Sequence, residues 1–227
     1  MSIVQTIPEA MIFDMDGTLF QTETVLIPAY NRMFEQLRAE GLYKSETPDI
    51  SLILGSLGML LADIWLRVMP DASPAAHDRA NVLLLEYQLE ELDNKGGELY
   101  PGVLETLVAL HRKGVRLFVA SNGLEAYVKG VVAAKGLDYL FEGLYSAGEY
   151  QTETKIELVR MLLDEYDLEN AWMVGDRSSD VEAGKGNHLF VVGCSYADFG
   201  SSKELNEADI LIAKFGDLLE LSAFTEE

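Results

Sequence analysis

Two acidic side chains, Asp14 and Asp16, stand two residues apart directly after an apolar run. The run at residues 10–13 is typical of a short buried strand, and Gly17 lets the chain turn after it. Two carboxylates at the end of a buried strand repel each other and lose hydration, so the pair is costly unless a cation neutralises it. The alternative is an Asp-Gly turn after an edge strand. We favour chemistry as the reason for the pair.

Polar side chains of matching chemistry occur where later elements begin or end, at Ser121, Asn122, Lys155, Asp176 and Asp180. Taken singly, they can be explained as turn residues, a solvated helix residue and a helix N-terminus. In doubly wound sheets, however, ligands bind beyond the carboxyl ends of the strands, so residues at strand exits are interpreted together. Their joint occurrence in this order favours a single site.

These side chains together meet the needs of phosphoryl transfer. Asp14 can be the nucleophile, because a carboxylate can accept a phosphoryl group and split one displacement into two. Asp16 can protonate the leaving oxygen and then activate water against the aspartyl phosphate. Ser121, Lys155 and loop N–H groups would hold the phosphate oxygens.

A magnesium ion is the cofactor that this set of oxygen ligands predicts. Mg²⁺ binds hard oxygen ligands and keeps several waters, and Asp14, Asp176 and the main-chain carbonyl of Asp16 can supply the protein share. The ion would let a carboxylate approach an anionic phosphate. Asp180 would then orient the waters on the metal, or Lys155.

The elements that must position these residues alternate along the second half of the chain. Strands are predicted at 115–120, 143–147, 171–174, 189–193 and 209–213, and helices at 101–113, 124–135, 154–165 and 178–185. Such alternation indicates a parallel sheet with helices on both faces, which is an α/β, doubly wound fold.

Between the first strand and this alternating part lie three helical patterns, at residues 25–42, 50–68 and 75–93. Because no second strand separates them, residues 21–97 are predicted to be an inserted all-helical cap domain. Residues 1–20 and 98–227 would form the catalytic core.

Composition limits the partners. The 227 residues include 17 basic and 38 acidic side chains, a formal charge of -21, which repels nucleic acid polymers and anionic membranes. A small anion can still bind where N–H groups, a Lys and a metal ion override that field. The single cysteine, Cys194, and the lack of a leader-like or membrane-spanning pattern predict a cytoplasmic protein, and we expect a monomer or weak dimer.

Four segments resemble the motifs of the haloacid dehalogenase-like hydrolase superfamily: Asp-Met-Asp-Gly-Thr-Leu, Ser-Asn, a lone Lys and Gly-Asp-Arg-Ser-Ser-Asp. The helical segment resembles the cap of the subgroup that includes phosphoglycolate phosphatase and beta-phosphoglucomutase. The resemblance implies a Rossmann-like core, magnesium dependence, nucleophile Asp14 and acid/base Asp16. It also implies phosphate binding by Ser121, Asn122 and Lys155, and metal binding by Asp14, Asp16 and Asp176.

Our leading hypothesis is a magnesium-dependent phosphatase that hydrolyses a small phosphorylated metabolite through an aspartyl phosphate. The alternatives are a phosphomutase of the beta-phosphoglucomutase type and a non-enzymatic, phosphate-responsive regulatory protein. Related enzymes of the subgroup carry a cap Arg shortly before a Gly, but residues 50–55 contain no basic residue. This departure argues against a substrate with a second strongly negative group, with Arg67 and Arg79 as the other possible anchors.

Overall fold

A six-stranded parallel sheet with the strand order β5-β4-β1-β6-β7-β8 forms the centre of the computed structural model, which describes residues 6–197 and 202–225. The strands are β1 (Ala10–Phe13), β4 (Arg116–Ser121), β5 (Phe141–Ser146), β6 (Ala171–Gly175), β7 (Phe190–Cys194) and β8 (Ile210–Ile212). All four residues of β1 are buried, as expected for the central strand of a sheet covered on both faces.

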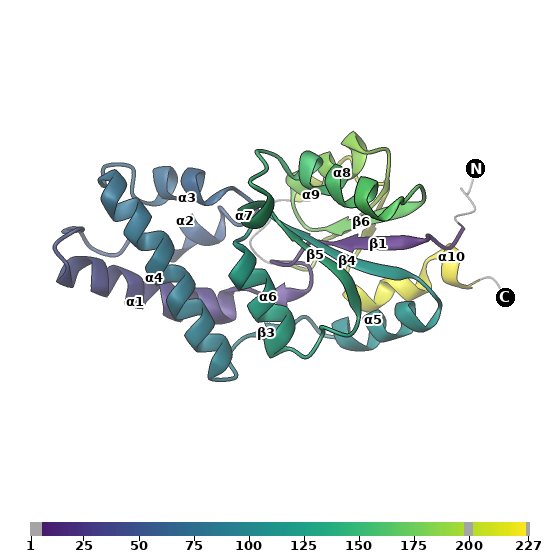
Figure 1. Cartoon of the computed structure of the whole chain (residues 1–227), viewed down its shortest axis with the longest axis horizontal. Coiled ribbons are helices and arrows are strands. Elements are labelled where there is room, and N and C mark those ends of the chain that lie inside the picture. Colours follow the sequence, from purple (N-terminus) through teal and green to yellow (C-terminus); the bar gives the residue numbers. More distant parts are fainter. Residues whose placement is uncertain (1–5, 198–201, 226–227) are drawn as a thin grey trace.

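Helices cover both faces of the sheet (Figure 1). They are α5 (Val103–Arg112), α6 (Glu125–Ala134), α7 (Ala147–Tyr150), α8 (Lys155–Tyr166), α9 (Ser178–Gly186) and α10 (Ser222–Thr225), with 3-10 helices η1 (Ser202–Leu205) and η2 (Phe215–Glu220). Alternate residues of β1 point to opposite faces: Phe13 joins the cluster under α5 and α6, and Ile12 the cluster under α8 and α9. The predicted doubly wound α/β, Rossmann-like fold is confirmed.

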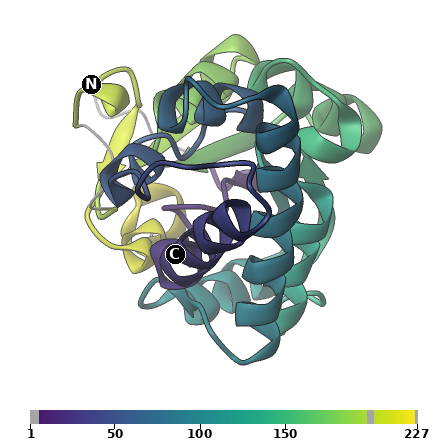
Figure 2. The ribbon, with the colours of Figure 1, turned by 90° about the vertical axis from the view of Figure 1, so that its left-hand side faces the viewer.

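A third hydrophobic cluster lies within the helical segment, at the left of Figure 1 and facing the viewer in Figure 2. Its helices are α1 (Glu23–Ala39), α2 (Ile50–Leu54), α3 (Leu61–Val68) and α4 (Pro74–Asp93). Tyr30, Phe34 and Trp65 are fully buried in it. The side chain of Ser73 accepts a hydrogen bond from Ala76 N and so caps α4, as Ser does at helix N-termini.

The prediction of one continuous helix over residues 50–68 is wrong in one respect, because this segment forms two helices, α2 and α3. Gly55 ends α2, and Gly58 adopts a left-handed backbone conformation with φ of 87°. The six residues between the helices form a turn that apolar periodicity did not reveal. This turn reaches the carboxyl ends of the sheet strands, as described below.

Two further strands, β2 (Phe20–Gln21) and β3 (Glu98–Leu99), were not predicted. They pair antiparallel where the chain enters and leaves the helical segment. Each is two residues long, too short for a periodic pattern to show.

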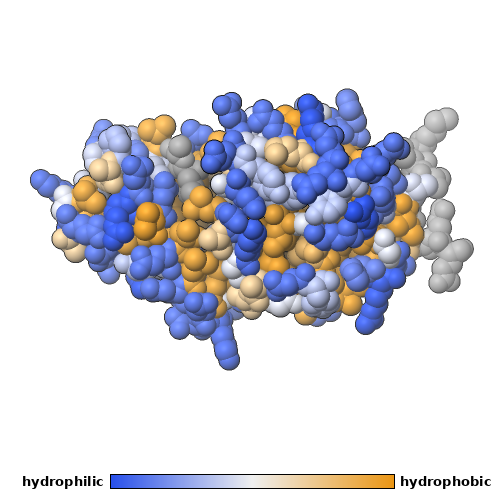
Figure 3. Space-filling view, in the orientation of Figure 1, coloured by the Kyte–Doolittle hydropathy of each residue, from blue (hydrophilic) through white to orange (hydrophobic). Residues whose placement is uncertain are grey.

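Hydrophilic side chains cover much of the face drawn in Figure 3, with smaller apolar areas between them. This surface agrees with the strongly acidic composition. Within the described part of the chain, no helix combines the length and apolar character needed to cross a bilayer.

The β2–β3 junction gives a test of packing. Gly97 has φ of 78°, and a Cβ there would lie 2.4 Å from Phe20 Cζ. Gly41 has φ of 74°, with nothing within 4 Å of such a Cβ. We expect Gly97→Ala to lower the free energy of unfolding by about 2–4 kcal/mol and Gly41→Ala by about 1 kcal/mol, measured by urea denaturation. Equal losses would contradict the close packing of Phe20 at this junction.

Candidate active site

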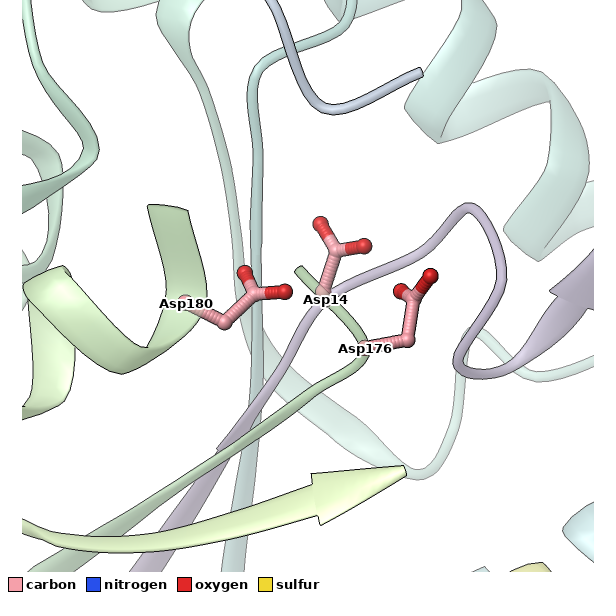
Figure 4. A group of neighbouring side chains, drawn as sticks. All are labelled: Asp14, Asp176 and Asp180. Carbon is pink, nitrogen blue, oxygen red and sulfur yellow. The ribbon is translucent and has the colours of Figure 1, made fainter. Parts of the chain in front are cut away.

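Asp14 and Asp176 follow neighbouring strands of the sheet. Because β1 and β6 are parallel, with Phe13 opposite Val174, their carboxyl ends lie side by side. We call this side of the sheet, at which the parallel strands end, the sheet edge. The Asp14 N–H donates to the carbonyl of Val174 at 2.9 Å, which continues the ladder one residue past the strand. Carboxylate oxygens of Asp14, Asp176 and Asp180 all lie within 4.8 Å of one another (Figure 4). The tertiary structure thus brings residues from positions 14 to 180 into one cluster.

Lys155, the first residue of α8, supplies the positive charge of this cluster. Its Nζ donates to Oδ1 of Asp14, and to Oδ1 of Asp180 at 2.5 Å. These three residues and Asp176 are each at most 4% exposed. When ionised, three carboxylates and one ammonium leave two negative charges uncompensated, an arrangement that a divalent cation would balance.

Asp176 retains an open ligand atom. Its Oδ1 accepts a hydrogen bond from Thr18 Oγ1 at 3.0 Å, whereas its Oδ2 is buried without a hydrogen-bond partner among the described residues. Gly17, with φ of 84°, packs so closely that a Cβ would lie 2.3 Å from that Oδ2. A free carboxylate oxygen beside two further carboxylates fits the hard ligand set of Mg²⁺.

Asp16 lies apart from the three-carboxylate cluster and is held by two hydroxyl groups. Its Oδ1 accepts hydrogen bonds from Thr22 Oγ1 and, at 2.7 Å, from Tyr127 OH on α6. Burial raises the pKa of Asp16 above its ordinary value, while the bonds from Thr22 and Tyr127 oppose the rise. Sequence analysis missed both hydroxyl groups. Tyr127 is 111 residues away and gives no local signal.

The electrostatics of the cluster follow from burial. Burial raises the pKa of Asp14 to about 7, with Asp180 and Asp16 adding to the rise and Lys155 opposing it. Burial, together with Asp14 and Asp180, also raises the pKa of Asp176 well above its ordinary value. For Lys155, burial favours the neutral form, but Asp14 and Asp180 outweigh it and raise its pKa. Lys155 is therefore charged at neutral pH.

Ser121 and Asn122 lie at the end of β4, beside the cluster. The Ser121 oxygen accepts a hydrogen bond from Gly123 N at 3.1 Å, so its hydroxyl hydrogen stays available to another acceptor. Asn122 donates from Nδ2 to the carbonyl of Gly58 at 2.7 Å, which ties the sheet edge to the turn between α2 and α3. Its Oδ1 is buried without a hydrogen-bond partner among the described residues. Sequence analysis did not foresee this link.

A cavity that is partly open to solvent lies between the sheet edge and the helical segment. Asp14, Asp16, Ser121, Asn122 and Tyr127 line it on the sheet side. The arrangement therefore places a carboxylate paired with Lys155, a second carboxylate and hydrogen-bond donors around one cavity.

The raised carboxylate pKa values predict how stability depends on pH when a chelator is present. A carboxyl group with a raised folded-state pKa stabilises the fold fully below its unfolded pKa, and this contribution is lost as pH rises through the folded value. For Asp14 the loss falls between about pH 4 and about pH 7. We expect the Tm of the wild-type protein to fall as pH rises across this range, and that of Asp14→Asn to fall less steeply. We also expect Mg²⁺ to raise Tm more at high pH than at low pH.

Thermal unfolding followed by circular dichroism measures these effects. The matched control is Asp138→Asn, which removes an exposed carboxylate outside the cluster. An Asp14→Asn profile parallel to that of the control would show that the buried cluster does not set the pH dependence.

Comparisons with known proteins agree with this geometry. Residues 11–194 match the family model described as haloacid dehalogenase-like hydrolase. Pyrophosphatase PpaX of Listeria monocytogenes is 27% identical over 214 residues, which cover 92% of this chain and 94% of the relative. Phosphoglycolate phosphatase of Rhodospirillum rubrum is 30% identical over 223 residues, which cover 94% and 89%.

The solved structure of a predicted phosphoglycolate phosphatase from Haemophilus somnus is also similar, with a TM-score of 0.80 at 24% identity. The match covers 95% of this chain and 98% of that one, and it shows the same fold. The family model spans most of the chain, including the sheet edge with its carboxylates. The chain therefore belongs to the haloacid dehalogenase-like hydrolases and is a phosphatase of that family.

Proposed function

We propose that this phosphatase is magnesium-dependent and hydrolyses a small phosphorylated metabolite through a phosphoryl group carried transiently on Asp14. The observation that carries the proposal is the pairing of Asp14 with Lys155, next to two further buried carboxylates and at the edge of a cavity. A buried carboxylate paired with a cation is suited to act as a nucleophile towards an anionic ester.

The metal would be held by Asp14, Asp176 and the main-chain carbonyl of Asp16. The unpaired Oδ2 of Asp176 and the surplus of buried negative charge support this assignment. When bound, Mg²⁺ would neutralise charge on the carboxylates and on the phosphoryl oxygens. Asp180 would keep Lys155 in place, since it accepts a hydrogen bond from Lys155 Nζ at 2.5 Å.

In the first step, a carboxylate oxygen of Asp14 forms a bond to phosphorus as the bond from phosphorus to the ester oxygen breaks. Asp16 donates its proton to that leaving oxygen, and its raised pKa favours the protonated form that this role needs. Ser121, Asn122 and Lys155 hold the phosphoryl oxygens while charge redistributes over them. The products are a free alcohol and an aspartyl phosphate.

In the second step, water attacks phosphorus. Asp16, now ionised, accepts a proton from that water, and the bond between phosphorus and the Asp14 oxygen breaks. Phosphate leaves, Asp14 is again a carboxylate and Asp16 is again protonated. The hydroxyl groups of Thr22 and Tyr127 keep the Asp16 carboxyl directed towards the cavity in both steps.

We further propose that residues 21–97 act as a cap over the core formed by residues 1–20 and 98–227. Their separate hydrophobic cluster and the short β2–β3 pair at the junction support this division. Closure of the cap would exclude bulk water from the aspartyl phosphate. The lone Cys194, buried and unpaired, suits a protein of the cytoplasm, and we expect a monomer or weak dimer.

Asp14→Asn tests the nucleophile. An amide cannot accept the phosphoryl group, so we expect kcat with p-nitrophenyl phosphate and Mg²⁺ to fall at least about 1,000-fold while the far-UV circular dichroism spectrum is unchanged. Asp138→Asn, the exposed control, should retain full activity. Retention of more than about one tenth of the activity in Asp14→Asn would exclude this mechanism.

Asp16→Asn separates the two steps. p-Nitrophenolate leaves readily without a proton, so the first step should survive in this variant while the second loses its base. We expect a burst of p-nitrophenolate of about one equivalent per protein in rapid-mixing measurements, followed by turnover slowed about 100-fold or more. An equal slowing of burst and turnover would contradict the assignment of the base to Asp16.

A further inference from the structure

We propose that the enzyme selects phosphate monoesters whose alcohol part is compact, uncharged and bears hydroxyl or carbonyl groups, and that it discriminates against esters with a second anionic group. The inference rests on the proposed phosphatase function and extends it to a substrate class. It comes from the wall of the cavity that faces the catalytic residues.

The far wall of the cavity is apolar. The helical segment contributes Leu26, Ile53, Leu57, Met59, Leu84 and Leu85 to it. Aliphatic walls favour the carbon skeleton of a ligand and offer no partner to a charge. The alcohol part of a bound ester would lie against this wall when its phosphoryl group is at Asp14.

None of the described residues that line the cavity is Lys or Arg, whereas Asp14 and Asp16 are both present. The arginines nearest in sequence to cavity residues have partners elsewhere. Arg67 is exposed and donates to the carbonyl of Gly55 at 3.1 Å, and Arg79 pairs with Glu40 at 2.7 Å. A second anion in the cavity would lose its hydration beside carboxylates without gaining a cation, which is strongly unfavourable.

Arg177 is not among the described residues that line the cavity, although it follows Asp176 in the chain. Its Nε pairs with Glu204 at 2.8 Å, while its Nη1 is buried without a hydrogen-bond partner among the described residues. At the carboxylate cluster itself, the positive charge is that of Lys155, to which a metal ion would add. Both would be engaged by the phosphoryl group that reacts.

Two neutral amides interrupt the apolar wall. Asn81 and Gln88 lie on α4 seven residues apart, with Leu84 and Leu85 between them, so all four occupy one face of the helix. Trp65 Nε1 donates to Oδ1 of Asn81, which fixes the orientation of this amide and leaves its Nδ2 as a donor. Gln88 is only 9% exposed, and its side chain makes no hydrogen bond with any described residue.

An amide in an otherwise apolar wall favours a ligand that can complete its hydrogen bonds. Hydroxyl or carbonyl oxygens on the alcohol part would do so without introducing charge. A site built in this way rejects analogues that leave its polar groups unpaired. The α4 face therefore supplies the selectivity, while the sheet edge supplies the chemistry.

Two esters that differ in a single group test the proposal. Glycerol 3-phosphate and 3-phosphoglycerate share a skeleton, but the first ends in a CH₂OH group where the second carries a carboxylate. With Mg²⁺ and a phosphate-release assay, we expect kcat/KM for glycerol 3-phosphate to exceed that for 3-phosphoglycerate by about 10-fold or more. p-Nitrophenyl phosphate serves as the general substrate that reports phosphatase activity as such.

Gln88→Lys introduces the missing cation and should reduce the preference for glycerol 3-phosphate by about 10-fold or more. Val82→Lys is the matched control, since Val82 lies on the same helix, is 53% exposed and does not line the cavity. Asn81→Asp is nearly isosteric and can still accept from Trp65, but it replaces the amide donor with a charge. It should lower kcat/KM for both esters, and more for 3-phosphoglycerate.

The outcomes are distinguishable. Equal rates for the two esters, a preference for 3-phosphoglycerate, or equal ratios in Gln88→Lys and Val82→Lys would overturn the inference while leaving the phosphatase intact. Should Gln88→Lys fail to fold, the wild-type ratio and Asn81→Asp still decide. Absence of phosphate release from every ester, p-nitrophenyl phosphate included, would overturn the proposed function and the inference together.

Discussion

Burial of several carboxylates around a single ammonium group is the interaction on which the candidate active site of this protein depends. Lys155 contacts both Asp14 and Asp180, while one oxygen of Asp176 beside them has no hydrogen-bond partner in the part of the chain that the structure describes. Burial works against ionisation of Asp14 and Asp176, and Lys155 offsets part of that cost only for Asp14. The cluster is thus incomplete as a set of protein charges, and a divalent cation is the component that would complete it.

The sheet makes this cluster possible because parallel strands end together. Pairing of β1 with β6 brings the carboxyl groups at their ends side by side, and α8 places Lys155 between Asp14 and Asp180. Gly17 leaves room for the Asp176 carboxylate, where any side chain would collide. Rigid elements hold the charged groups, and the burial that they impose shifts the pKa values.

In our proposal, the helical segment sets the selectivity of the site. Relatives of this chain include proteins named for pyrophosphate and for phosphoglycolate, and each of these two compounds carries a second anionic group. The cavity wall here combines aliphatic side chains with the amides of Asn81 and Gln88, and no described lining residue is basic. In our proposal, chemistry and selectivity are divided between two parts of the chain, which are joined by the hydrogen bond from Asn122 to the turn at Gly58.

Sequence alone determined the family, the doubly wound fold and the residues that cluster at the sheet edge, because each leaves a local pattern. Asp14 and Asp16 follow an apolar strand, and strands alternate with helices from residue 98 onward. Only the tertiary structure revealed that residues 50–68 are broken by a turn, that Tyr127 donates a hydrogen bond to Asp16 and that Gln88 lies in a cavity wall. The physical reason is distance along the chain: periodicity reports which face of an element is buried, whereas the partner of a polar group depends on how distant elements pack.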